Sequence, residues 1–579
     1  MTITRRRAVQ MLAAAPALGA VGPALARQPL DPNGAAAREL KAALGDKLLS
    51  VTSPLAECVK AKGAGADALF GRIQNPYWLG DEPGLTQTLG WTEAWTSQPS
   101  PLAVAAETAA DIAKAVEIAR RHDLKLAIKG GGHSYYGNSN AAGSLLIWTR
   151  RMDAVELHDA FAPVGAPAGS AGVPAVSVGA GAIWGRVYRK VMVEGGRYVQ
   201  GGGCLTVGVA GFVMGGGFGM LSKTYGTGAS NLLEAEVVTA DGQVRIVSAH
   251  RDPELFFAFR GGAGGSFGVV SRMTLRTDPL PETIGAVLFS VEAKSDVAWA
   301  KLATQMVDFY ADRLFEPRWG EQIRFGPGRR ISVAMLFHGL SKGEAEAVWA
   351  PFLDAIRAAP GDYGWREEPV VIAAPGGRFW DPSFLRSLPG VVLPDSRPDA
   401  PDNNLFWATN KGEAAQVLHA YESAWLPQGL LAPDRRAALV GALMGASRDW
   451  SLSLHTNKGM AGGHPAAIAR TRETAMNPAV CDAFALLICA ADAPPAYPGI
   501  PGHEPDVAQS RKEKALVKAA MAPIRRLVPD AGAYVSEADY FQRDWQRAFW
   551  GENYGRLLAA KRRYDPAGVF TGHQTVGSG

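Results

Sequence analysis

The sequence predicts an α+β protein with more than one domain. Between 103 and 148 a strand, a helix and two further strands follow one another, which indicates a small α/β unit. From about 282 onward, alternating apolar strands such as 331–337 are interleaved with amphipathic helices such as 342–358, which is typical of an antiparallel sheet covered by helices. The length of 579 residues also exceeds the size of most single domains.

The first α/β unit is delimited by its boundary residues. Thr108 is a preferred N-cap residue, and Asp111 lies in the first turn of the helix predicted over 109–122. The alternating strand 124–129 runs directly into a Gly triplet at 130–132, and another strand follows the loop. The unit is therefore predicted to be strand, helix, strand, loop, strand.

A second α/β segment follows, and a helix closes the chain. The stretch 161–174 is rich in Gly, Ala and Pro and is predicted to be an exposed insertion. Asp241 and Gly242 favour a tight hairpin turn. Asp565 and Pro566 end a helix predicted over 545–564. The other predicted elements are strand 175–179, helix 183–194, hairpin strands 233–239 and 244–248, and strand 269–276.

These elements divide the chain into four predicted parts. Pro279 and Pro281 mark the main internal boundary. The parts are an export signal at 1–26, a first domain at 38–278 with subdomains at about 95–160 and 173–278, a second domain at 282–526, and a C-terminal segment at 531–579.

Composition and charge exclude several classes of function. The formal net charge is +4 and no Lys/Arg run exceeds three residues, so the sequence gives no reason to expect nucleic-acid binding. Cys58, Cys204, Cys481 and Cys489 form no CxxC pair and no metal-ligand spacing, so no metal site is predicted. We expect Cys481 and Cys489 to be buried free thiols.

The first 26 residues indicate a targeting signal. Arg5-Arg6-Arg7 precedes a soft apolar run at 11–25 that ends in a small-x-small pattern, Ala24-Leu25-Ala26. This pattern predicts a twin-arginine export signal, with an ordinary secretory signal as the alternative. The run is too short and too weakly apolar for a membrane span. The protein is therefore expected to use the twin-arginine machinery and to be periplasmic or extracellular.

Two Gly-rich segments carry the candidate chemistry. A Gly triplet after a buried strand exposes successive backbone N–H groups that can bind phosphate, and His133 follows this triplet directly. The run 201–219 contains Cys204, whose thiolate would be a good nucleophile. Taken alone, the triplet supports a turn or a phosphate-binding loop, and the longer run supports a packing surface or a loop around a planar ligand.

Together these segments resemble the berberine bridge enzyme-like group of the vanillyl-alcohol oxidase/p-cresol methylhydroxylase flavoproteins. The matching stretches are 131–135, 204–208, 215–219 with 225–226, 231–242, 260–270, 551–557 and 561–570. The resemblance is weak between about 282 and 450. It implies a two-subdomain FAD-binding domain, an α+β substrate domain with an antiparallel sheet, and a C-terminal segment that folds back onto the FAD-binding domain.

The resemblance also implies the residues of the site. FAD is expected to be bonded at its 8α carbon to His133 and at its C6 to Cys204. A small residue at the position of Val207 accompanies the use of oxygen in relatives. Further cofactor contacts are expected from Gly130, Gly131, Gly132, Ser134, Val207, Gly208, Gly211, Gly215, Gly216, Gly219 and Val269.

The proton acceptor is where this chain departs from the family. The family pattern Tyr-x-Asn-Tyr-x-Asp is replaced here by Tyr534-Val-Ser-Glu537-Ala-Asp539, so the second Tyr is a Glu. Phe218 also stands where several relatives have a Tyr. Tyr534 and Glu537 are therefore the candidate bases, because a base must reach the proton that it removes. Asn553 is a candidate polar contact.

The predicted function is that of an FAD-linked oxidase. A substrate C–OH or C–N carbon gives hydride to flavin N5, and oxygen is reduced to hydrogen peroxide. Sugars, alcohols and secondary metabolites all remain open as substrates. The alternatives are a flavin dehydrogenase with another electron acceptor and a non-catalytic flavin-binding protein.

Two other enzyme classes are disfavoured by local context. Gly264-Gly-Ser266-Phe-Gly268 fits the hydrolase pattern G-x-S-x-G, but a strand follows it where that motif needs a helix. Gly179-Ala-Gly181 begins a dinucleotide-binding pattern, but Trp184 occupies the place of the third Gly.

Overall fold

The first α/β unit forms a four-stranded sheet in the computed structural model, which describes residues 27–578. Three strands are parallel and the short β1 is antiparallel to its neighbour β4. Helix α5 (Ala109–Arg121) begins at the predicted cap, where Thr108 and Asp111 form a reciprocal capping box. The strand order is β1 (Leu48–Ser50), β4 (Leu102–Ala105), β6 (Leu145–Trp148), β5 (Leu126–Lys129). The proposed leader at 1–26 lies outside the described residues.

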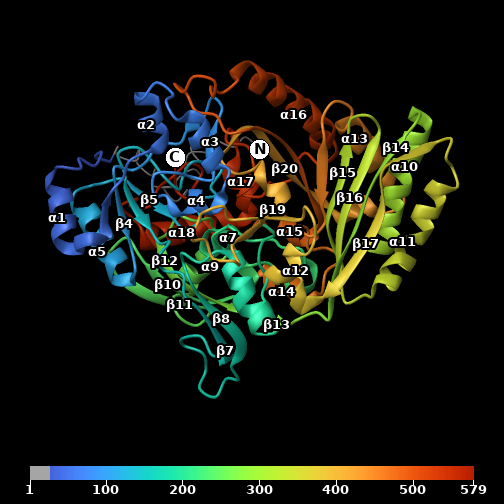
Figure 1. The fold of residues 1–579 in the computed structure, drawn as a ribbon. Coiled ribbons are helices and arrows are strands. Elements are labelled where there is room, and N and C mark those ends of the chain that lie inside the picture. Colours follow the sequence, from blue (N-terminus) through green and yellow to red (C-terminus); the bar gives the residue numbers. More distant parts are fainter. Residues whose placement is uncertain (1–26, 579) are drawn as a thin grey trace, which may run out of the picture.

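A second, antiparallel sheet of five strands packs against the same helix. Val238 and Val269 of this sheet share one apolar cluster with Ile112 of α5, so the helix lies between the two sheets. The segment after β7 projects from the molecule, as the insertion predicted at 161–174 requires (Figure 1). The strand order is β11 (Val244–Ser248), β10 (Leu232–Val238), β12 (Val269–Arg276), β8 (Val173–Gly179), β7 (Val155–Phe161).

The second half of the chain builds a nine-stranded sheet. Its strands are antiparallel to their neighbours except for β2, which pairs with β20 in parallel. Strands β2 and β3 come from the N-terminal part of the chain, outside the range 282–526. The order is β17 (Tyr363–Pro375), β14 (Thr283–Ala293), β16 (Arg330–His338), β15 (Trp319–Gly326), β21 (Leu452–His455), β22 (Ala483–Ala493), β20 (Gln416–Pro427), β2 (Thr88–Trp91), β3 (Trp95–Thr96).

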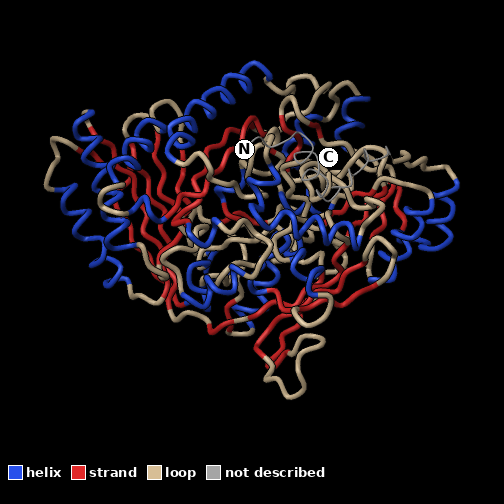
Figure 2. Tube along the Cα trace, turned by 180° about the vertical axis from the view of Figure 1, so that it is seen from behind, coloured by secondary structure: helices blue, strands red, loops and turns tan. Residues whose placement is uncertain are grey.

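Four helices cover one face of this sheet. One apolar cluster contains residues from the sheet together with Leu302, Trp349, Leu443 and Met521 of the helices. In Figure 1 two of them, α10 and α11, stand along the outer side of the sheet. The helices are α10 (Asp296–Phe309), α11 (Lys342–Arg357), α13 (Arg436–Ala446) and α16 (Val507–Leu527). The other face of the sheet is directed toward the smaller sheets. Figure 2 shows the loops that lie between these two strand-rich halves of the molecule.

The C-terminal segment returns to the smaller sheets. The prediction of one helix over 545–564 is wrong, because the chain breaks into α17 (Trp545–Trp550), a 3-10 turn and α18 (Tyr554–Tyr564). The break is at Gly551, whose φ of 53° lies in a region that favours glycine. Buried Lys561 in α18 donates from Nζ to the Ser266 carbonyl at 2.6 Å and pairs with Asp565. These contacts fix the segment to the strand-and-loop unit before β12.

Within the part of the chain that the structure describes, the four cysteines are free thiols. Cys481 and Cys489 are buried, which confirms the prediction for both, and Cys489 lies on β22. No cluster of three or more His, Cys, Asp or Glu side chains suited to a metal occurs among residues 27–578. None of the described helices is long and apolar enough to cross a membrane.

Candidate active site

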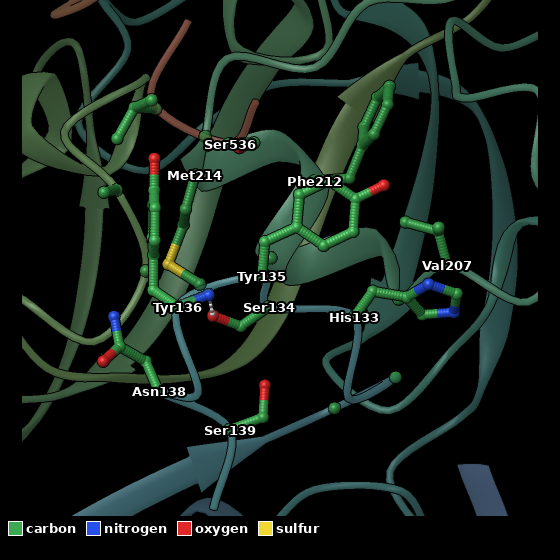
Figure 3. Close-up of a pocket in the computed structure, with 18 of the residues that line it drawn as sticks. His133, Ser134, Tyr135, Tyr136, Asn138, Ser139, Val207, Phe212, Met214 and Ser536 are labelled. Atoms are coloured by element: carbon green, nitrogen blue, oxygen red, sulfur yellow. Dashed lines mark hydrogen bonds between the residues drawn. The ribbon is translucent and has the colours of Figure 1, made fainter. Parts of the chain in front are cut away.

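A cavity of about 520 Å³ lies where the two Gly-rich loops, the C-terminal segment and the large sheet meet. Figure 3 shows the loop after β5, from which His133, Ser134, Tyr135 and Tyr136 extend along this cavity. The cavity has two contrasting walls. The glycine wall is formed by lining residues within 130–134, 202–215 and 263–268, and the polar wall by side chains of the large sheet, of the loops next to its strands and of 534–537.

The glycine wall begins where β5 ends. Lys129 is 1% exposed, and its Nζ donates to the carbonyls of Glu82, Pro83 and Leu85, each at 2.9 Å. Burial lowers the pKa of Lys129 to about 7. This buried side chain holds the 82–85 loop against the base of the Gly triplet.

The two Gly-rich loops touch through their backbones. A Cβ at Gly131 would lie 2.6 Å from the Gly208 nitrogen, and a Cβ at Gly208 would lie 2.7 Å from the Gly131 nitrogen. Gly132 has a φ of 77°, which a side chain would strain. The glycines therefore allow a backbone approach that brings His133 beside the loop that carries Cys204.

One hydroxyl joins His133 to Cys204. The Thr206 Oγ1 lies 3.3 Å from His133 Nε2 and 3.5 Å from Cys204 Sγ. Since Nε2 faces Thr206, Nδ1 is the imidazole nitrogen that has no hydrogen-bond partner among the described residues. Both side chains are partly accessible in the cavity.

Their protonation states follow from burial. Desolvation lowers the pKa of His133 to about 4, so the imidazole is neutral at pH 7 and has a free lone pair. Desolvation, reinforced by the charge of Glu413, raises the pKa of the Cys204 thiol, while hydrogen bonds from Thr206 oppose the shift. His133 is thus a ready nucleophile, whereas Cys204 must first lose a proton.

The second Gly-rich run meets the C-terminal segment. The Gly217 N–H donates to the Tyr534 phenol oxygen at 3.3 Å, and a Cβ at Gly215 would lie 2.5 Å from Ser536 Oγ. Tyr534 is 7% exposed and packs edge-on against Phe218. Burial raises the pKa of Tyr534, so its phenol stays protonated near neutral pH.

Glu537 lies on the polar wall with a cationic partner. Its carboxylate forms an ion pair with the Lys458 ammonium, and both side chains are largely buried but line the cavity. The next residue back, Asn457, donates from Nδ2 to Glu321 at 2.8 Å and to the Gly219 carbonyl at 3.1 Å. Two consecutive residues therefore hold two carboxylates at this wall.

The structure brings most of the predicted cofactor residues to the cavity. Three positions lie outside its lining. Gly216 and Gly219 pack against Met476 and the Gly201 carbonyl, and Val269 is fully buried in the core beneath the loops. The predicted residues that line the cavity are Gly130, Gly131, Gly132, His133, Ser134, Cys204, Val207, Gly208, Gly211 and Gly215.

Of the predicted catalytic residues, Tyr534 and Glu537 line the cavity and Asn553 does not. The Asn553 amide donates to the Met476 carbonyl at 2.7 Å, so it fastens the turn before α18. A contact of Asn553 with the substrate stays a prediction.

The sequence did not reveal the polar wall. Five of its members lie in the region where the resemblance is weakest and three lie just after it, and they are far apart in the chain. The one unusual local feature among them is the φ of 76° at Glu321, and a backbone angle cannot be inferred from the sequence. The cavity-lining residues in question are Glu321, Gln322, Asn410, Glu413, Tyr421, His455, Asn457 and Lys458.

Comparison with known proteins identifies the family. The model of the FAD binding domain matches residues 100–248, and the model described as berberine and berberine like matches residues 533–577. An FAD-linked oxidoreductase, easE, of Arthroderma benhamiae is 30% identical to this chain, over 82% of the chain and 88% of the relative. The chain belongs to the berberine bridge enzyme-like flavoproteins of the vanillyl-alcohol oxidase family. Like its relatives it is an FAD-linked oxidoreductase.

Solved structures of this family share the fold. A VAO-type flavoprotein from Myceliophthora thermophila is 23% identical with a TM-score of 0.73, over 96% of this chain and 97% of that chain. A chitooligosaccharide oxidase is 19% identical with a TM-score of 0.62, over 85% and 94%. A glucooligosaccharide oxidase from Acremonium strictum, described with 6-S-cysteinyl, 8α-N1-histidyl FAD, is 21% identical with a TM-score of 0.61, over 82% and 91%.

The cavity of this flavoprotein fits its cofactor. Gly203, Gly211 and Gly265 line the cavity, and a Cβ at each would meet no heavy atom within 4 Å. Glycine at these points keeps open the space that a flat ring system with a pyrophosphate needs. The loop at 130–134 and the C-terminal residues 571–575 line the same space, so both matched parts of the family fold contribute to the cavity.

Proposed function

We propose that this flavoprotein is an oxidase that converts a substrate C–OH or C–N centre to the carbonyl or imine while oxygen is reduced to hydrogen peroxide. A bound flavin supplies the hydride acceptor for such a reaction. The observation that carries the proposal is the meeting of His133 and Cys204 at one hydroxyl in a cavity that has a carboxylate on its opposite wall. The chain's own groups hold the cofactor on one side and receive a proton on the other.

Two-point attachment of the cofactor is part of the proposal. His133 is neutral at pH 7 with Nδ1 available, so it can bond the 8α carbon of FAD. Cys204 would bond the flavin C6 after losing its proton, with Thr206 orienting the thiol. Each attachment would replace a C–H hydrogen of FAD, which leaves as a proton, while the two electrons pass to the flavin ring and from there to oxygen. The relative described with 6-S-cysteinyl, 8α-histidyl FAD supports this pairing.

Glu537 is the proposed proton acceptor. Its carboxylate lines the cavity and forms an ion pair with the Lys458 ammonium. Tyr534 is less suited to the task, because its oxygen already accepts the Gly217 N–H and burial raises its pKa. We therefore assign Tyr534 to fixing the Gly-rich run and Glu537 to receiving the proton.

Oxygen as the final electron acceptor rests on the surroundings of Val207. This side chain lines the cavity on the Cys204 loop and leaves more room beside the ring system than a larger residue would. A dehydrogenase would use the same substrate side but would react slowly with oxygen. Stopped-flow mixing of the reduced protein with air distinguishes the two: reoxidation within seconds supports the oxidase, and reduced flavin that persists for minutes contradicts it.

The first experiment is a peroxide screen. The purified protein is mixed in air with panels of alcohols, amines and sugars, and peroxide is measured with a coupled peroxidase. We expect at least one panel to yield peroxide and, without oxygen, to bleach the flavin absorbance. A flavin that no electron donor in any panel bleaches would indicate a non-catalytic binding protein.

We also propose export through the twin-arginine machinery. The support is the Arg5-Arg6-Arg7 pattern alone, since residues 1–26 lie outside the described part of the chain. Replacing Arg6 and Arg7 by Lys should retain the protein in the cytoplasm of a bacterial host. Unchanged export of that variant would instead support an ordinary secretory signal.

A further inference from the structure

The polar wall of the cavity is rich in carboxylates. Glu321, Glu413 and Glu537 all line it, and Lys458 is the one Lys or Arg side chain among the lining residues of the described chain. Lys458 forms its ion pair with Glu537. Within residues 27–578, no Lys, Arg or His side chain forms an ion pair with Glu321 or Glu413.

The histidines of the cavity do not supply the missing positive charge. Burial lowers the pKa of His133 to about 4 and also lowers the pKa of His455 well below its ordinary value. His573 also has a lowered pKa, mainly because it is desolvated. All three are therefore neutral at pH 7 and bring no positive charge to the wall.

Glu413 lines the same cavity as two aromatic rings. The rings of Tyr135 and Tyr421 lie 5.3 Å apart, centre to centre, and both line the cavity. The pKa of each phenol is raised mainly by burial and further by the charges of Glu413 and Glu537. Aromatic faces next to a carboxylate are the surroundings that favour an organic cation.

Glu321 has a strained backbone conformation. Its φ is 76° within strand β15, a region that is unfavourable for a residue with a side chain. The Asn457 amide donates a hydrogen bond to the Glu321 carboxylate, and burial raises the pKa of Glu321. Packing alone gives no reason to keep a strained carboxylate facing a cavity.

We propose that the polar wall recognises a positively charged substrate, a protonated or quaternary amine, with Glu413 and the rings of Tyr135 and Tyr421 as its binding site and Glu321 as a second acidic contact. The cation supplies the counter-charge that the protein itself withholds. This inference rests on the proposed function, because it takes the polar wall to be the substrate side of the cofactor.

The test is a binding experiment on the oxidised holoprotein and needs no turnover. Benzyltrimethylammonium, benzyl alcohol and benzoate share a phenyl ring and differ in charge. Each is titrated at pH 7.5, and the dissociation constant is read from the change in flavin absorbance. We expect the cation to bind about tenfold or more tightly than the alcohol, and benzoate to bind weakest.

Two variants assign the effect to the wall. Glu413→Gln should remove most of the preference for the cation and leave the binding of benzyl alcohol within about twofold. Glu368→Gln, at an exposed site on β17 outside the cavity, is the matched control and should behave as wild type. Flavin content per protein reports whether each variant is folded.

The preference for the cation over the alcohol should also decrease as the pH is lowered. The Glu413 pKa is raised by burial, so its carboxylate is lost as pH falls through that raised value, and the cation should then bind no better than the alcohol. Equal binding of cation and alcohol at pH 7.5, or an unchanged preference in Glu413→Gln, would overturn the proposal. Peroxide formation is measured separately, so an oxidase without this preference contradicts only the present inference.

Discussion

The two walls of the cavity are built on different principles. The glycine wall is made of backbone that can approach closely because side chains are absent, as at Gly131 and Gly208. The polar wall is made of side chains from β15, the segment before β20, β20 itself, and β21 with the loop after it, with Glu537 added from the C-terminal segment. The glycine wall explains how a cofactor is held, and the polar wall supplies the groups that can bind a substrate and accept its proton. Changes to the first should therefore act on flavin content, and changes to the second on rate.

The largest effect should come from the polar wall. Glu537→Gln removes the proposed proton acceptor and should lower kcat/KM by about 10²- to 10⁴-fold with a substrate found in the peroxide screen. Flavin content and reoxidation by air should not change. Glu552→Gln, exposed outside the cavity, is the control. Activity of Glu537→Gln within threefold of wild type would remove Glu537 from the role of base.

The glycine wall should respond in stability and flavin content. Gly131→Ala places a Cβ 2.6 Å from the Gly208 nitrogen, where backbone must move. The expected cost is about 1–3 kcal/mol of unfolding free energy, with less bound flavin, measured by thermal unfolding and by absorbance. Gly441→Ala is the control, because its Cβ would meet no heavy atom within 4 Å. An unchanged Gly131→Ala protein would contradict the close-approach argument.

The two attachment residues should differ in pH dependence. The apoprotein of Cys204→Ala is mixed with FAD, and the rate at which His133 bonds the flavin is measured. This rate should be nearly constant from pH 6 to 9, since the His133 pKa of about 4 leaves the imidazole neutral throughout. In His133→Ala, bond formation by Cys204 should rise by about tenfold per pH unit, because its raised pKa keeps the thiolate scarce. Denaturing gels with flavin fluorescence follow both reactions. A flat profile for Cys204 would mean that a base activates it.

The smallest effect should come from Tyr534→Phe. This change removes the acceptor of the Gly217 N–H and costs about 1 kcal/mol of stability. Its effect on kcat/KM should stay below about tenfold, since the phenol is not the proposed base. A loss of a thousandfold or more with normal flavin content would instead assign proton removal to Tyr534.

The contrast between the walls also explains what the sequence could predict. The fold class, helix α5 with its Thr108 cap, and the hairpin at Asp241 depend on local patterns and were predictable. His133 and Cys204 follow Gly-rich motifs, but only the resemblance to the family predicted that they share one site. The polar wall was not, because residues such as Glu321 and Lys458 meet only through the pairing of distant strands. The helix break at Gly551 was missed because a glycine's φ is decided by tertiary packing.

The central claim is that one cofactor is fastened at two points of the glycine wall. Mass spectrometry of the denatured protein tests it most directly. Wild type, His133→Ala and Cys204→Ala should each carry the mass of one FAD, with fragments that place the bond at the remaining residue in each single variant. The double variant should carry none. Covalent flavin in the double variant, or its complete loss from either single variant despite normal folding, would contradict the claim.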